Sequence, residues 1–304
     1  MDSDKIKVLF VVNKKAGHSP KPMLYQMISS HSEKFNYQSE YYEMNSNDHK
    51  ISLNNIINQY QPNIVAAVGG DGTVNLVSSV IYQKDISLLI IPIGSANGMA
   101  KELQIPDQLE SCLDLIIKGN TVEVDLLKVN DEISMHLADV GLNARIVKRF
   151  QLDTKRGLLT YGKHLFYEIF LIRKKRFIIY YDKKVKKVSA ISLTFANANK
   201  YGSGAVINPD GLLNDGLFEI CIVKPFPKWK VFTIAFQMFR NTLKTSKYFE
   251  IIQCQNATVT CKRKTLLQVD GEIIGKVNMI KLTCLPKVLK VIIPAGLRHP
   301  TIID

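Results

Sequence analysis

Hydrophobic residues along the first part of the chain form short runs, and stretches with helical spacing of apolar positions separate these runs. The runs typical of buried strands are 6–12, 36–44, 63–68 and 87–94. The stretches with helical spacing are one that ends near residue 32, then 50–60, 73–82 and 108–119. Strands that alternate with helices are typical of a parallel, doubly wound sheet, so we predict an α/β domain over residues 1–125.

The pattern changes after about residue 124, where strand-like runs with period-two alternation dominate. These runs are 132–140, 176–181, 188–198, 217–223, 257–269, 279–285 and 288–294. Helical insertions interrupt them at about 158–174 and 228–246. Alternation of this kind indicates antiparallel sheets, so we predict a β-sandwich domain over residues 126–304. The last ~15 residues are candidates for a return to the first domain.

A glycine-rich stretch, GGDGTVN at 69–75, directly follows one of the predicted strands. Glycine loses much backbone entropy on folding, so such a cluster needs a tight turn or a ligand that approaches the main chain closely. Amides at the start of a helix beyond a parallel strand favour phosphate. Asp71 would repel bare phosphate, so we expect it to hold a divalent cation or a sugar hydroxyl, or to handle a proton. A tight turn with Asp71 as helix N-cap is the alternative.

Two further loops, at 13–17 and 92–100, also join a predicted strand to a predicted helix through Gly, Asn and Ser. Three such loops at one edge of a sheet predict a nucleotide pocket more strongly than any single one. The motifs GxxxxGK[ST], GxGxxG and HRD are absent. Their absence excludes the commoner nucleotide-binding folds.

Composition limits the partners and the cellular location that we expect for this protein. The net charge of +13 predicts attraction to a polyanion, either nucleic acid, an anionic bilayer or a phosphorylated substrate. No apolar run of 18 residues and no signal peptide is present, so we expect a cytoplasmic protein. Five scattered cysteines without a CxxC pair argue against a disulfide framework and a structural zinc site.

Five segments together resemble the diacylglycerol kinase catalytic-domain family of soluble bacterial lipid kinases, whose relatives include sphingosine and ceramide kinases. The segments are NKKAG at 13–17, GGDGTVN at 69–75, PIGSANGMA at 92–100, YGSGAVINPDGLLNDGLFEICIV at 201–223 and LLQVDGEIIG at 266–275. The resemblance implies an NAD kinase- and diacylglycerol kinase-like α/β domain followed by an antiparallel β-sandwich. It also implies transfer of the γ-phosphoryl group of ATP to a lipid hydroxyl, with diacylglycerol converted to phosphatidic acid.

The resemblance also implies roles for single residues. The proton acceptor is Glu272, and Asp71 and Asp125 belong to the accompanying network of metal and water. A structural Mg²⁺ is held by the Asp215 side chain with the main-chain carbonyls of Leu212 and Leu217. The role of Asp270, which residue chemistry alone assigns to an Asp-Gly turn, stays open. The positions implied to bind nucleotide are Asn13, Lys14, Lys15, Ala16, Gly17, Gly69, Gly70, Asp71, Gly72, Thr73, Asn75, Gly94, Ser95 and Asn97.

Departures from the family pattern keep other acceptors open. Lys14 replaces a proline and Ser95 a threonine, while Gly98 and Asn143 each stand where the family has aspartate. Sphingosine kinases also lack an acid at the Gly98 position, so a sphingoid-base kinase is the second hypothesis. NAD kinase is a more distant one, because that family's Thr-Pro-Thr-Gly-Ser-rich segment is missing. A lipid-binding relative without turnover is the non-enzymatic alternative.

Basic segments suggest how such a protein would reach a lipid. Nine Lys or Arg residues lie between 163 and 187, a density that can bind anionic headgroups. The aromatic residues at 229–239 recur with helical spacing among basic residues. This stripe either packs on its own sheet or contacts a membrane. We expect peripheral binding to an anionic membrane and no binding of nucleic acid, since no recognised module frames the basic residues. The sequence is also compatible with a homodimer.

Overall fold

The structure is a computed structural model that describes residues 5–14, 16, 21–44, 49–152, 163–164, 167–168, 171, 173–202, 204–296 and 301–302. The chain divides into two compact units. Unit 1 comprises Met1–Val124 and Lys287–His299, and unit 2 comprises Asp125–Pro286 and Pro300–Asp304. Each unit is described separately below.

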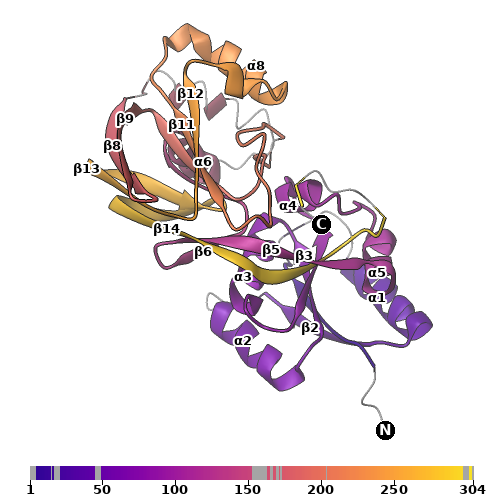
Figure 1. Cartoon of the computed structure of the whole chain (residues 1–304). Helices are drawn as coiled ribbons and strands as arrows, with labels where there is room; N and C mark the ends of the chain where they lie inside the picture. The colour runs from indigo at the N-terminus through magenta and orange to yellow at the C-terminus, as the bar shows by residue number, and fades with distance from the viewer. Residues whose placement is uncertain are drawn as a thin grey trace. The chain divides into compact units, whose positions relative to one another are not determined.

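Unit 1 alternates strands and helices (Figure 1). Its elements are β1 (Lys7–Val12), α1 (Lys21–Phe35), β2 (Gln38–Glu43), α2 (His49–Tyr60), β3 (Ile64–Gly69), α3 (Asp71–Ile81), β4 (Ser87–Pro92), α4 (Gly98–Glu102) and α5 (Leu109–Lys118). The sheet order is β2-β1-β3-β4, and all pairs are parallel. Helices α1 and α5 contact each other on one face, and α2 and α3 on the other (Figure 1). This arrangement is the doubly wound sheet that the sequence predicts.

Burial explains why these stretches form these elements. Strand β3 is buried at all six positions, and β1 and β4 are buried at every position but the first. Strands covered by helices on both faces need continuous apolar runs rather than alternation. Helix α3 buries Val74, Val77, Ser78 and Ile81, which recur at the spacing of one helix face.

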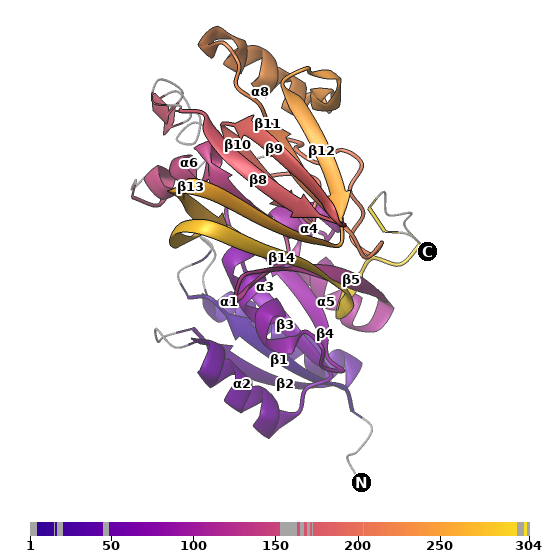
Figure 2. The ribbon, with the colours of Figure 1, turned by 60° about the vertical axis from the view of Figure 1, so that its left-hand side comes forward.

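Unit 2 is built mainly of antiparallel strands (Figure 2). Its elements are β5 (Asn120–Val129, which begins in unit 1), β6 (Glu132–Ser134), β7 (Leu137–Gly141), α6 (Leu142–Leu152), β8 (Lys175–Tyr181), β9 (Lys184–Ala190), β10 (Ser192–Ala196), β11 (Phe218–Val223), η1 (Lys228–Lys230), α8 (Val231–Phe239), η2 (Leu243–Thr245), β12 (Phe249–Cys254), β13 (Asn256–Val269) and β14 (Glu272–Ile293). The order β12-β11-β10-β7-β13 is antiparallel throughout. The residues of β14 from Lys287 onward belong to unit 1, where Lys290 and Val291 pair with β4 in parallel.

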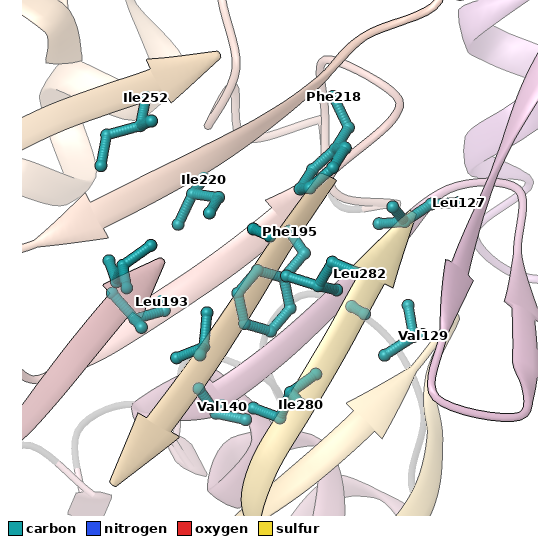
Figure 3. Close-up of a cluster of buried hydrophobic side chains, with 14 of the residues drawn as sticks. Leu127, Val129, Val140, Leu193, Phe195, Phe218, Ile220, Ile252, Ile280 and Leu282 are labelled. Atoms are coloured by element: carbon teal, nitrogen blue, oxygen red, sulfur yellow. The ribbon is translucent and has the colours of Figure 1, made fainter. Parts of the chain in front are cut away.

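A large apolar core lies inside unit 2 (Figure 3), and a second, smaller apolar cluster lies where α8 meets β11 and β12. The large core combines inward-facing side chains from β5, β7, β10, β11, β12 and β14, among them Phe195, Phe218 and Leu282. Strand β13 bends around this core, because its first half pairs with β8 and its last residues pair with β7. The predicted antiparallel β-sandwich is therefore confirmed.

Several details differ from the patterns expected of unit 2. The predicted strands 279–285 and 288–294 form one strand, β14, and the predicted helix 228–246 is divided into η1, α8 and η2. The predicted strand 132–140 is interrupted at Met135 and His136, and the predicted strand 188–198 is split at Ile191 between two pairings. Helix α6 has no counterpart in the sequence-based prediction. The predicted helix over 158–174 lies mostly outside the described residues.

Candidate functional site

Three loops meet at the carboxyl edge of the parallel sheet of unit 1. They follow β1, β3 and β4, whose parallel registers bring their ends to the same edge. The Asn13 amide donates to the Val68 carbonyl at 3.1 Å, and the Asn13 side chain lies 3.3 Å from Thr73 Oγ1. The Ile93 amide donates to the Gly69 carbonyl at 3.0 Å. Hydrogen bonds therefore join the three predicted nucleotide loops.

The glycines of this edge have different reasons to be glycine. A Cβ on Gly94 would lie 2.5 Å from the Cα of Gly70, so these two residues pack main chain against main chain. A Cβ on Gly69 would collide with Thr73 Oγ1 at 2.2 Å. A Cβ on Gly72, in contrast, would meet nothing within 4 Å. Packing within the protein therefore explains three glycines but leaves Gly72 facing open space, where a ligand can approach the main chain.

Asp71 does not cap its own helix. Gly70 is the N-cap of α3, and the Asp71 carboxylate instead accepts the Met99 amide of α4 at 3.1 Å. Asn97 has a left-handed backbone (φ 53°), and its side-chain amide donates to the Gly94 carbonyl at 3.0 Å. Its Oδ1 atom is buried and accepts no hydrogen bond within the described part of the chain. Because a buried carbonyl oxygen is costly to leave unpaired, this atom is an acceptor for a donor from a bound molecule, either water or a ligand.

The remaining predicted nucleotide positions differ in what surrounds them. Lys14 forms an ion pair with Glu43 at the end of β2. The Ala16 amide closes a turn onto the Asn13 carbonyl at 3.1 Å. Asn75 lies half-buried in the first turn of α3, and Ser95 is exposed in the loop after β4. Lys15 and Gly17 lie outside the described residues.

In unit 2, Asp125 and the predicted metal loop lie together. The Asp125 side chain is fully buried, and its Oδ2 atom accepts the Gly216 amide at 2.6 Å. The Asp125 amide donates to the Leu213 carbonyl, also at 2.6 Å. Asp215 closes its own turn by accepting the Leu217 amide at 3.0 Å. The structure therefore brings Asp125 to the loop 212–217, whereas Asp71 belongs to unit 1.

Glu219 adds a third carboxyl group to this loop region, after Asp125 and Asp215. Gln253 Nε2 lies 3.2 Å from Asp215 Oδ2 and 3.0 Å from Glu219 Oε1, so one amide bridges the two acids. Burial raises the pKa of Glu219 to about 7, and the neighbouring charge of Asp215 adds to the rise. No cluster of three or more His, Cys, Asp or Glu side chains that could hold a metal occurs in the described ranges. A cation here would depend on Asp215 and main-chain carbonyls, an all-oxygen set that fits a hard divalent ion.

Glu272 follows a tight hairpin turn. Asp270 and Gly271 both have positive φ angles, 46° and 87°, as a two-residue type I′ turn requires. Asp270 is half-buried, and its carboxylate accepts from Ser134 Oγ at 2.6 Å and from the amides of Met135 and Leu137 at 2.8 and 2.9 Å. These bonds hold the interruption between β6 and β7. Asp270 is thus a structural anchor, and the exposed Glu272 begins β14 directly after the turn.

Unit 2 also contains an apolar cavity of about 280 Å³ beneath α8. Its walls come from α6, from β10 and β11, and from the inner face of α8, including Ile146, Ile234 and Met238. Its polar side chains are Asn143, Ser192, Thr194 and Tyr201, and none of the described residues that line it is charged. An apolar pocket with a few converging polar groups is the usual form of a small-molecule site.

Asp139 lies behind the polar side chains of this cavity. It is fully buried and accepts hydrogen bonds from Thr194 Oγ1, Asn143 Nδ2 and Tyr201 OH, the last at 3.0 Å. Burial raises the pKa of Asp139, and the hydrogen bonds oppose that rise. Asn143, which stands where the family has aspartate, fits this network because an asparagine amide can donate to Asp139 whereas an ionised aspartate cannot. Asp139 therefore orients the cavity's polar groups.

Gln268 connects this network to the turn that precedes Glu272. Its Nε2 donates to Asp139 Oδ2, and its Oε1 accepts the Gly271 amide at 2.7 Å. The side chain is buried on β13, opposite Asp139 of β7. A single amide thus links the polar groups of the cavity to the main chain of the hairpin.

Sequence reasoning missed Asp139, Glu219 and Gln268. Each lies in a strand whose neighbours are strongly apolar, in LADVG, FEICIV and TLLQV. A charged or amide side chain inside such a run is rarely buried without hydrogen-bond partners. That signal could have marked all three as members of a buried polar network.

Comparisons with known proteins agree with this architecture. A family profile described as "Diacylglycerol kinase catalytic domain" matches residues 7–129. A second profile, "YegS C-terminal NAD kinase beta sandwich-like domain", matches residues 137–293, more than half of the chain. A solved structure described as a putative diacylglycerol kinase from Bacillus anthracis str. Sterne has the same fold. Its TM-score is 0.79 at 17% identity, over 97% of this chain and 100% of that one.

Curated relatives carry names of the same kind. A "Probable lipid kinase YegS-like" of Enterobacter sp. (strain 638) is 27% identical over 76% of this chain and 78% of the relative. A "Probable lipid kinase YegS" of Salmonella arizonae is 32% identical over 52% of this chain and 55% of the relative. Two family domains that follow one another along the chain, together with the shared fold, identify the family. The chain belongs to the lipid kinase family that joins a diacylglycerol kinase catalytic domain to a YegS-type β-sandwich domain.

Proposed function

We propose that this protein is an ATP-dependent kinase that phosphorylates the free hydroxyl of diacylglycerol, with Mg²⁺ as the metal. One observation carries the proposal. The apolar cavity beneath α8 ends in uncharged polar side chains, and Gln268 ties these side chains to the hairpin that bears Glu272. Such a cavity suits an acyl chain, with a hydroxyl-bearing head at its polar groups.

The chemistry of the polar groups favours diacylglycerol over a sphingoid base. A sphingoid base carries an ammonium group, which would need a carboxylate partner in an apolar pocket. The polar side chains there are an amide and hydroxyls, and Asp139 behind them already accepts four hydrogen bonds. A neutral glycerol hydroxyl needs only such uncharged partners.

The residues of the two units would have separate tasks. ATP would supply the γ-phosphoryl group, and the divalent cation would neutralise the charge on its phosphates. Main-chain amides around Gly70 and Gly72 would bind phosphate oxygens, and Asn97 Oδ1 would accept a hydrogen bond from the nucleotide. Glu272 would accept the proton of the lipid hydroxyl, and Gln268 would position the turn that carries it.

The test is a transfer assay with labelled ATP and Mg²⁺ on mixed micelles that contain either diacylglycerol or sphingosine. We expect label in diacylglycerol, and at least ~100-fold less turnover for Glu272→Gln with nearly unchanged ATP affinity, because a general base contributes on this scale. Glu123→Gln, at an exposed glutamate of β5, is the matched control and should behave as the wild type.

Two results would change the assignment. Labelling of sphingosine but not of diacylglycerol would show that the acceptor is a sphingoid base, and the assignment as a kinase would stand. Absence of label in any lipid or in NAD, with intact ATP binding, would favour the lipid-binding relative without turnover.

A further inference from the structure

Helix α8 is apolar on two opposite sides. Val231 and Ile234 are buried and belong to the inner side, where Ile234 packs with Cys221 and Phe249 on the neighbouring strands β11 and β12 (Figure 2). On the outer side Phe232 and Phe236 are 71% and 62% exposed. A helix that is hydrophobic all round needs a second apolar environment besides its own core.

The exposed side extends beyond α8 itself. Trp229 of η1 is 66% exposed and Phe239 at the end of α8 is 53% exposed. With Phe232 and Phe236 they are spaced by three, four and three residues, which places all four rings along one side of the helical segment. We call these four residues the aromatic face. Contiguous exposed aromatic side chains of this kind mark an interaction surface.

The charges around the aromatic face decide what it contacts. Between residues 224 and 249 the sequence contains no acidic residue. It contains six basic ones: Lys224, Lys228, Lys230, Arg240, Lys244 and Lys247. Two of these six form ion pairs with acids outside this stretch, Lys224 with Glu250 and Lys244 with Asp210. Lys230 Nζ lies 4.4 Å from the centre of the Trp229 ring, and the Arg240 guanidinium lies 5.5 Å from the centre of the Phe236 ring. Cations at the rim of exposed rings fit a surface that is apolar inside and negatively charged at its boundary.

We propose that the aromatic face is the surface by which this protein docks on an anionic lipid bilayer. Tryptophan and phenylalanine would insert at the level of the acyl chains near the headgroups, and the basic side chains would contact the anionic headgroups. A second copy of the chain is the weaker candidate, because a two-fold contact would place basic residues against basic residues.

Docking there has a consequence for the acceptor, which rests on the proposed function. Val231, Ile234, Ala235 and Met238 line the cavity from the inner side of α8, and Phe239 belongs to both the cavity lining and the aromatic face. The helix that meets the bilayer is therefore also a wall of the cavity. A lipid would enter past α8 without crossing water.

Trp229 is the only tryptophan of the chain, so its fluorescence reports on this surface alone. Vesicles of phosphatidylglycerol and phosphatidylcholine, without nucleotide, should shift its emission to the blue, and lipids brominated on the acyl chains should quench it. Pure phosphatidylcholine vesicles should have a much smaller effect. The double variant Phe232→Ser/Phe236→Ser should partition at least ~10-fold less into the anionic vesicles.

The matched control removes two exposed apolar side chains of unit 1, Met23 and Ile51, which are 58% and 61% exposed. Met23→Ser/Ile51→Ser should bind vesicles as the wild type does. No lipid-dependent shift, or an equal loss in the control, would overturn the proposal. So would a blue shift that rises with protein concentration in the absence of lipid and accompanies dimers in sedimentation.

Failure of docking and failure of the proposed function are separable. Vesicle binding needs neither ATP nor turnover, so it would persist if the protein were not a kinase. A kinase that docks elsewhere would still phosphorylate a short-chain diacylglycerol dissolved as monomers, and the Phe232→Ser/Phe236→Ser variant would keep its activity on vesicles.

Discussion

At the scale of single residues, some glycines at the carboxyl edge of the parallel sheet are required by the fold, whereas Gly72 is better explained by ligand binding. Gly94 is needed by the fold, because any side chain there would meet the Gly70 main chain. Gly72 is not, because a Cβ there would face open space and its backbone is helical with φ outside the left-handed region. A glycine that the fold does not require and that the first turn of a helix disfavours has another reason to be there.

Replacing Gly72 by alanine should therefore stabilise the protein and weaken nucleotide binding. We expect the free energy of unfolding to rise by about 0.5–1 kcal/mol, because alanine is the better helix former. ATP affinity should fall by about tenfold or more, because the new methyl group occupies space where phosphate oxygens approach the main chain. Chemical denaturation and calorimetric titration measure the two effects.

Gly94→Ala serves as the comparison. Its Cβ would lie 2.5 Å from the Gly70 Cα, so it should lower the free energy of unfolding by about 1–3 kcal/mol. If Gly72→Ala instead bound ATP as tightly as the wild type, the loop that follows β3 would not hold the phosphates.

Residues of the site differ in how far the sequence could predict them. The loops after β1, β3 and β4 could be predicted, because parallel strands bring their carboxyl ends to one edge whatever the rest of the fold does. The network around Asp139 could not. It combines Asn143, Thr194, Tyr201 and Gln268. Asn143 follows Asp139 by four residues, but Thr194 and Gln268 reach Asp139 only through the pairing of β7 with β10 and β13.

At the scale of elements, the loop between Leu212 and Leu217 leads into β11 and is bound by Asp125 of β5. Asp125 of β5 binds this loop through its carboxylate, which accepts the Gly216 amide, and through its own amide, and Asp215 holds the turn. Asp215 and Glu219 are bridged by one glutamine amide. A divalent cation would offset their repulsion and stabilise the folded loop by mass action.

Millimolar Mg²⁺ without nucleotide should therefore raise the melting temperature of the wild type, and a chelator should reverse the effect. Asp215→Asn should abolish most of this rise, because the amide keeps an oxygen for the Leu217 amide but loses the charge that binds the cation. Asp210→Asn is the control, since Asp210 is 68% exposed and pairs with Lys244. Equal Mg²⁺ effects in all three proteins would remove the metal from this loop.

The elements also show what the hydrophobic pattern of the sequence could not predict. The stretch 188–198 alternates apolar and polar residues on both sides of Ile191, yet its pairing changes there. The residues before Ile191 pair with β8, and those after it pair with β7 and β11. No local pattern marks such a change, since both strands alternate in the same way. The spacing of the aromatic residues at 229–239 did not decide whether they pack on their own sheet or are exposed. The structure places Trp229, Phe232, Phe236 and Phe239 on the exposed side, because Val231 and Ile234 already fill the contact with the sheet.

At the scale of the whole molecule, the question is whether total charge or local charge recruits the protein to a membrane. The chain has a net charge of +13, and long-range attraction to an anionic surface depends on such a total. No helix in the described ranges is both long and apolar enough to span a bilayer. The basic hairpin of β8 and β9 carries the exposed residues Lys183, Lys184 and Lys187, which offer a local alternative.

Two triple variants with the same change in net charge can separate these contributions. Lys183→Glu/Lys184→Glu/Lys187→Glu reverses the hairpin, and Lys5→Glu/Lys34→Glu/Lys50→Glu reverses exposed positions of unit 1. We expect the hairpin variant to lose part of its sedimentation with anionic vesicles at ~0.1 M salt and to keep the binding that the aromatic face provides, because charges act on headgroups only within about 10 Å at this ionic strength. The unit 1 variant should lose far less. Equal losses would mean that the total charge governs recruitment and that the hairpin has no special part in it.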